Sequence, residues 1–78
     1  MGNLEKYLGV FESVFGLSAA EAETAVFKST RQWDSVGHVN LMTNIEEAFD
    51  ISLEPDDILD FRSFAMGKEI LSKYGIAF

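Results

Sequence analysis

The stretch QWDSVGHVNL, residues 32–41, marks the point where a loop is predicted to give way to a helix. Asp34 is placed to act as the N-cap, because its side-chain oxygen can accept from the free amides of the next turn. Ser35 is then the first helical residue. At about 100° per residue, the inward side carries His38, Leu41, Met42, Ile45, Ala48 and Phe49. The opposite side carries Val36, Val39, Asn40, Thr43, Glu46, Glu47 and Asp50, where the helix should end.

Apolar spacing also predicts a helix near the N-terminus. Leu4, Leu8, Phe11 and Phe15 recur at i, i+4, i+7 and i+11, which is typical of an amphipathic helix over about residues 3–15. Gly16 is the expected stop. The long connection over residues 17–33 begins with Ser18 and Glu21, whose capping-box spacing predicts a short helical turn.

Two aromatic residues in this connection, Phe27 and Trp33, are expected to pack it onto the helices, because a loop of this length needs anchors in a small domain. Alternatively, Trp33 is a recognition residue beside Ser35.

The C-terminal third predicts a short helix and a longer one. Pro55 suits a first helical position, and Ile58, Leu59 and Phe61 are the apolar residues of the short helix. Ser63 is placed to cap the last helix, which should end at Gly75 and pack Phe64, Met66, Ile70, Leu71 and Tyr74 inward. Because no alternating strand pattern is present, the chain is predicted to be one all-α domain over residues 1–78, with three main helices and a short one.

Composition limits the classes of function. The 78 residues include no cysteine, so neither a disulfide framework nor a thiolate zinc site is expected. Thirteen acidic residues against six basic ones give a formal charge of −7, which argues against nucleic acid and favours partners with basic patches. The first residues, MGNLEKYLGV, lack the features of a signal peptide, and no stretch approaches a membrane span. We expect a cytoplasmic monomer that does not insert into membranes.

Ser35 has three interpretations. It can help to cap the helix, as serine commonly does, although Asp34 is better placed for this. It can be a nucleophile, because His38 lies one turn further along, but a hydrolase also needs an oxyanion hole and a pocket that excludes water. It can carry a phosphate-linked group, because a helix start favours an anion. The nearby acids Asp56, Asp57 and Asp60 lack the spacing of a calcium loop, and no metal is predicted.

The segment WDSVGHVNLMTNIEEAFDISLEPDDI, residues 33–58, resembles the acyl carrier protein family. In that family a serine of an Asp-Ser-Leu or Asp-Ser-Val motif, at the start of the second helix, carries phosphopantetheine. The likeness extends to the chain length, the acidic balance, the long first loop and the Phe-Arg-Ser-Phe run at residues 61–64. It implies an acyl-carrier-like helical fold with 4'-phosphopantetheine on Ser35, transferred from coenzyme A by a phosphopantetheinyl transferase that also recognises Asp34. The domain itself would catalyse nothing.

The resemblance also assigns the two sides of the central helix. A partner face of Val36, Val39, Asn40, Thr43, Glu46 and Glu47 would meet acyl-loading and acyl-processing enzymes. An acyl pocket would be lined by His38, Leu41, Met42, Ile45, Phe49, Ile58 and Phe61. Several residues depart from the common pattern, among them Gly37, whose cost in a helix is roughly 0.5 to 1 kcal/mol relative to alanine. These departures favour a specialised polyketide-type or lipid-type carrier over a housekeeping carrier of fatty acid biosynthesis. An aminoacyl or peptidyl carrier and an unmodified helical adaptor are the alternatives.

Overall fold

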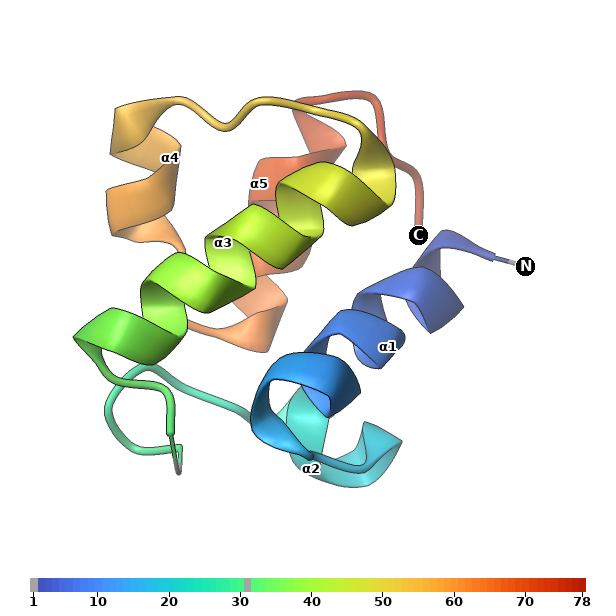
Figure 1. Cartoon of the computed structure of the whole chain (residues 1–78). Helices are drawn as coiled ribbons and strands as arrows, with labels where there is room; N and C mark the ends of the chain where they lie inside the picture. Colours follow the sequence, from blue (N-terminus) through green and yellow to red (C-terminus); the bar gives the residue numbers. More distant parts are fainter. Residues whose placement is uncertain (1, 31) are drawn as a thin grey trace.

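The computed structural model describes residues 2–30 and 32–78, and this part of the chain folds into five helices (Figure 1). They are α1 (Asn3–Phe15), α2 (Ala19–Glu23), α3 (Ser35–Phe49), α4 (Pro55–Asp60) and α5 (Phe64–Ser72). No strand occurs in these two ranges, which hold one isolated antiparallel bridge between Val26 and Ser63. The all-α prediction is therefore confirmed, and the structure has two short helices, α2 and α4.

The helix boundaries follow the capping signals of the sequence. Gly16 ends α1 in the left-handed conformation, with φ 69°, and its amide donates to the Glu12 carbonyl over 2.8 Å. The Ser18 hydroxyl accepts from the Glu21 amide, while the Glu21 carboxylate accepts from the Ser18 amide, so the capping box starts α2. Pro55 is at the start of α4, and the Ser63 hydroxyl caps α5 by accepting from the Met66 amide. The predicted starts and stops of these helices are thus confirmed, apart from the end of α5, which comes at Ser72, ahead of Gly75.

An aromatic core joins α1, α5 and the loop before α3. Tyr7 of α1 stacks on Phe64 of α5 with 4.4 Å between ring centroids, and its hydroxyl donates to the Phe64 carbonyl over 2.8 Å. Burial raises the pKa of the Tyr7 hydroxyl, so this hydrogen-bonded form stays neutral. Trp33 is fully buried and stacks on Phe15 at 5.6 Å, which confirms that it anchors the loop before α3. Each such aromatic pair contributes about 0.5–1.5 kcal/mol beyond the burial of its area.

Two expectations about inward-facing residues are wrong. On α1 the buried residues are Tyr7, Val10, Phe11 and Phe15, so the core face is turned away from Leu4, which is 38% exposed. On α5, Met66 is 42% exposed because the helix presents Gly67 to the core. A β-carbon on Gly67 would lie 2.1 Å from the Tyr7 hydroxyl oxygen and 2.3 Å from the Phe61 ring. The aromatic side chains therefore occupy the space beside Gly67, and Met66 points to the surface.

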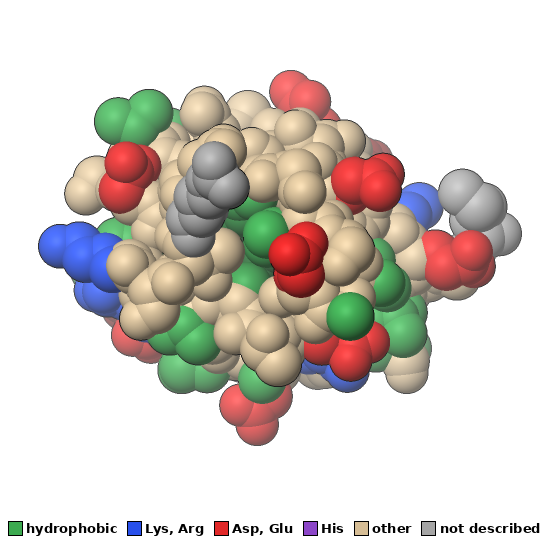
Figure 2. All heavy atoms as spheres, turned by 90° about the horizontal axis from the view of Figure 1, so that it is seen from below, with side chains coloured by type: hydrophobic (Ala, Val, Ile, Leu, Met, Phe, Trp, Pro, Cys, Tyr) green, Lys and Arg blue, Asp and Glu red, His purple; other side chains and the backbone are tan. Residues whose placement is uncertain are grey.

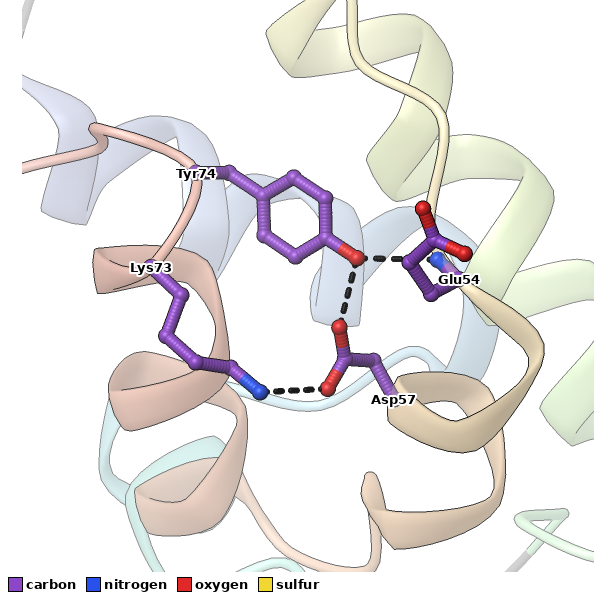
Figure 3. A network of polar contacts seen from close by, with 4 residues as sticks. All are labelled: Glu54, Asp57, Lys73 and Tyr74. Carbon is purple, nitrogen blue, oxygen red and sulfur yellow. Dashed lines mark hydrogen bonds and ion pairs between the residues drawn. The ribbon is translucent and has the colours of Figure 1, made fainter.

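The short helix α4 is attached by polar contacts to the chain that follows α5 (Figure 3). The buried Asp57 carboxylate accepts from the Lys73 ammonium over 2.6 Å and from the Tyr74 hydroxyl over 2.6 Å. The same Tyr74 oxygen accepts from the Glu54 amide over 2.8 Å. The hydrogen bond from Lys73, followed by that from Tyr74, lowers the pKa of Asp57 below its usual range. Asp57 is therefore a structural anchor of α4.

The two ends of the chain lie close together (Figure 1). The Asn3 side-chain amide donates to the Ala77 carbonyl over 2.9 Å, and the Phe78 ring lies 5.3 Å from that of Tyr7. Among the described residues, no helix has the length and apolar character needed to cross a bilayer.

Candidate functional site

At the start of α3, the residue that caps the helix, Asp34, is followed by an exposed serine, Ser35. Asp34 is the N-cap, as predicted: its carboxylate accepts from the Gly37 amide over 2.9 Å, and its carbonyl accepts from the His38 amide over 2.8 Å. Ser35 is the first helical residue and is exposed. Within residues 2–30 and 32–78, its hydroxyl makes no hydrogen bond. The cap is supplied by Asp34, which leaves the Ser35 oxygen accessible to solvent.

Gly37 lets the preceding loop approach α3 closely. A β-carbon at this position would lie 2.0 Å from the Gln32 carbonyl oxygen and 3.0 Å from the Phe15 ring. No other residue type fits without moving the loop backbone. The sequence analysis noted the cost of glycine in a helix; the close contact with the Gln32 carbonyl is the reason that glycine is needed here.

His38 is hydrogen-bonded through both ring nitrogens. The Trp33 indole N–H donates to His38 Nδ1 over 3.0 Å, and His38 Nε2 lies 2.8 Å from the Ile58 carbonyl oxygen. Because an indole nitrogen can only donate, Nδ1 must be the acceptor, so Nε2 carries the hydrogen and donates to Ile58. This arrangement joins the loop, α3 and α4 through one imidazole. It also leaves no ring nitrogen free to take a proton from Ser35.

Two segments that are distant in sequence meet beside Ser35. The Phe27 amide donates to the Arg62 carbonyl over 2.7 Å, and the Phe64 amide donates to the Ala25 carbonyl over 3.1 Å. The loop after α2 is thereby fixed against the connection from α4 to α5. Arg62 Nε donates to the Leu59 carbonyl over 2.7 Å, and its guanidinium carbon lies 4.8 Å from the Phe27 ring centroid. Both contacts hold the Arg62 side chain along this connection.

These elements enclose a hollow of about 250 Å³ that we call the Ser35 hollow, lined by Phe27, Ser35, His38, Leu59 and Arg62. The structure brings Ser35 and His38 together, as the sequence suggested. It adds Phe27, Leu59 and Arg62, which the sequence analysis did not place at the site. Their proximity depends on the backbone pairing of residues 25–27 with 62–64, which has no local sequence signal.

The predicted acyl-pocket residues do not form one group around Ser35. Leu41, Met42, Ile45 and Phe61 are buried in the aromatic core. Ile58 is half-buried in α4, and Phe49 is half-buried near the end of α3, where its ring packs 6.4 Å from that of Phe78. Of the seven, His38 is the residue that lines the Ser35 hollow.

The predicted partner face is largely exposed. Val36 and Val39 have 71% and 63% of their surface exposed, and Asn40, Thr43 and Glu47 are also at the surface. Glu46 differs, because it is half-buried and its carboxylate accepts from the Leu53 amide over 2.8 Å. Glu46 therefore orders the loop after α3 in this structure. Leu59 of α4, which the sequence analysis named only as an apolar residue of the short helix, is 63% exposed and adds an apolar side chain to this surface.

The face seen in Figure 2, with α2 and the loop before α3, carries scattered acidic side chains around a hollow with hydrophobic side chains at its base. One hollow in this region has a volume of about 620 Å³ and lies between the end of α1, α2 and the loop before α3. Its lining contains none of the predicted site residues and is largely polar loop. The Ser35 hollow is therefore the better candidate site.

Comparisons of this chain with models of known protein families, with curated proteins and with solved structures find no match.

Proposed function

We propose that this protein is a carrier that holds acyl groups on a phosphopantetheine arm attached to Ser35. The observation that carries the proposal is the exposed Ser35 hydroxyl at the first position of α3, free of hydrogen bonds within the described residues while Asp34 caps the helix. The resemblance of residues 33–58 to acyl carrier proteins supports the same assignment.

The residues around Ser35 fit a phosphate-linked group. The side chain is at the surface, so a transferase can reach it, and Arg62 lies in the same hollow as a positive charge for a phosphodiester. The amides of Ser35 and Val36 belong to the first turn of α3, where backbone N–H groups have no partner within the helix. When bound, the arm supplies a terminal thiol that carries the acyl group as a thioester. The chain has no cysteine of its own for this purpose.

We infer that the domain is not an enzyme. A serine hydrolase needs a histidine that accepts the serine proton, and both nitrogens of His38 are already engaged with Trp33 and Ile58. In the carrier, His38 has a positioning role, since it ties α3 to α4 beside the attachment residue.

The exposed residues of α3 are the proposed surface for partner enzymes. Val36 and Val39 supply a small apolar centre, and Glu47 adds an acidic rim that attracts basic patches. The partners are a phosphopantetheinyl transferase and the enzymes that load and process the acyl group, in the cytoplasm, with the carrier acting as a monomer. The departures from the family pattern at Gly37, His38, Asn40 and Thr43 favour a specialised polyketide-type or lipid-type pathway.

Sequestration of a long acyl chain among Leu41, Met42, Ile45, Phe49, Ile58 and Phe61 belongs to the same proposal. The packed core would have to open, and each buried methylene would favour this by about 0.8 kcal/mol. If NMR shifts of these residues are the same in short-chain and long-chain acyl forms, the acyl chain stays outside.

Modification of the purified protein tests the proposal. Apo protein is incubated with coenzyme A and a broad-specificity phosphopantetheinyl transferase, and intact and peptide mass spectra are recorded. Ser35→Ala is the test variant, and Ser13→Ala, which changes an exposed serine on α1, is the matched control. We expect one phosphopantetheine on Ser35 in the wild type and in the Ser13 variant. A folded wild type that gains none would favour the unmodified adaptor, and loading by an aminoacyl-activating enzyme would favour a peptidyl carrier.

A further inference from the structure

We propose that the Ser35 hollow is a subsite for the part of the arm nearest the protein, with Arg62 paired to the phosphodiester and Phe27 and Leu59 packed on the adjoining dimethyl carbon. This inference rests on the proposed function and adds a docked state of the arm to it. Ser35 itself lines the hollow, so a group bonded to its oxygen begins inside the subsite.

Arg62 is held in place before any ligand arrives. Its Nε donates to the Leu59 carbonyl over 2.7 Å, its guanidinium carbon lies 4.8 Å from the Phe27 ring centroid, and its carbonyl accepts from the Phe27 amide. The donation through Nε uses one of the five guanidinium N–H groups. The four on the terminal nitrogens remain for two parallel hydrogen bonds to phosphate oxygens, a geometry for which lysine has no equivalent.

The charge around Ser35 favours this role for Arg62. Asp34 adds a carboxylate next to the attachment residue, and the whole chain has a formal charge of −7. A phosphodiester placed there would be repelled by this field. Arg62 is the one cation among the five lining residues, so it is the group that offsets the added negative charge.

The size of the hollow limits how much of the arm it can take. The hollow has a volume of about 250 Å³ and five lining residues, so it can hold only a small part of the arm. That space suits a phosphate and the branched carbon next to it. The remaining arm, with its thiol, extends beyond the hollow and stays accessible to partner enzymes.

The apolar residues of the hollow suit the carbon of the arm that carries two methyl groups. The Phe27 ring is half-buried and fixed by its neighbours, while Leu59 is 63% exposed and presents an apolar side chain with no role in the core. Covering Leu59 and part of Phe27 with two methyl groups removes apolar surface from water, which favours the docked state. The subsite therefore explains an exposed leucine beside a cation.

The test uses the modified protein and NMR of the unmodified and modified forms. Mass spectrometry first establishes the addition to Ser35; failure at this step overturns the proposed function and the subsite together. Isotope-filtered spectra then look for contacts between the methyl groups of the arm and the side chains of Phe27 and Leu59. The ³¹P shift of the phosphodiester is recorded in the wild type and in Arg62→Gln, Arg62→Lys and Leu59→Ala. Lys6→Gln is the control, because it removes the charge of a lysine on α1, far from the hollow.

We expect methyl contacts to both side chains in the wild type and in the Lys6 variant. In Arg62→Gln the contacts should fall to background and the ³¹P resonance should move toward that of a free phosphodiester, with a smaller effect in Arg62→Lys. Leu59→Ala, which shortens an exposed side chain of the hollow, should weaken the contacts to Phe27 in the modified protein. A modified protein with no such contacts and a ³¹P shift unaffected by Arg62 would show an arm free in solvent, and would overturn the subsite alone.

Discussion

The two walls of the Ser35 hollow are held by different forces. On one side, α3 and the loop before it rest on an aromatic core in which Phe11, Phe15 and Trp33 are buried against one another. On the other side, α4 is fixed by hydrogen bonds of Asp57 to Lys73 and Tyr74 (Figure 3) and by that of the Ile58 carbonyl to His38. Ser35, the proposed attachment residue, therefore lies on the wall supported by the aromatic core, whereas Leu59 lies on the wall held mainly by hydrogen bonds.

The difference has a physical basis. Burial of aromatic side chains yields several contributions of about 0.5–1.5 kcal/mol per pair in addition to the area removed from water. A hydrogen bond between protein groups contributes about 0.5–1.5 kcal/mol net, because water competes for both partners. Loss of one core contact should therefore reduce the stability of the whole fold, while loss of one α4 contact should first loosen α4 itself.

The largest expected effect comes from filling the core at Gly67. Gly67→Ala places a β-carbon against the Tyr7 hydroxyl and the Phe61 ring, so it should reduce the free energy of unfolding by on the order of 3 kcal/mol. Gly9→Ala is the matched control, because a β-carbon at this exposed position of α1 meets nothing within 4 Å. The control should stabilise the protein by about 0.5–1 kcal/mol. Urea unfolding measures both, and equal effects would contradict the close packing of Tyr7 and Phe61 against Gly67.

A smaller effect is expected from His38, which joins the two walls. His38→Ala leaves the buried Trp33 indole N–H without its acceptor, which costs about 1–3 kcal/mol of stability. Thr43→Ala, at an exposed position of α3, is the control and should change stability by less than about 0.5 kcal/mol. Hydrogen exchange should also show faster exchange of α4 amides than of α1 amides in the His38 variant. Unchanged exchange in α4 would mean that the Ile58 contact does not hold this helix.

The smallest effect is expected at Asp57, and it depends on pH. The pKa of Asp57 is lowered in the folded protein, so the stabilisation is present above the ordinary carboxyl pKa and is lost as pH falls through the folded-state pKa. Asp57→Asn should therefore lower Tm at neutral pH, and its Tm should converge with that of the wild type in acid. Asp56→Asn, which changes an exposed acid one residue away, is the control. A constant difference at every pH would contradict the ionic anchor.

The fold was predictable where local chemistry determines it. The caps at Asp34 and Ser63, the capping box of Ser18 and Glu21, and the glycine stop at Gly16 involve neighbouring residues, and all are confirmed. The inward faces were less predictable, because they depend on which neighbour fills each space. Met66 is exposed because Tyr7 and Phe61 occupy the space beside Gly67, which no helical periodicity reveals.

The candidate site was predictable only in part. Ser35, Asp34 and His38 lie within one turn, so their proximity follows from the helix. Phe27 and Arg62 come from segments that meet through backbone hydrogen bonds, and sequence spacing carries no sign of that pairing. The need for glycine at position 37 was likewise not predictable, since its tight contact is with the Gln32 carbonyl of the loop.

The most direct test of the account compares Asp34→Ala with Ser35→Ala in two assays, urea unfolding and transfer of phosphopantetheine. Asp34→Ala should lose about 1 kcal/mol of stability with its cap. Ser35→Ala should keep its stability within about 0.5 kcal/mol and accept no arm, because its hydroxyl has no structural partner within the described residues. Contradiction would come from a Ser35→Ala variant that loses as much stability as Asp34→Ala while the folded wild type gains no arm, since Ser35 would then be a capping residue.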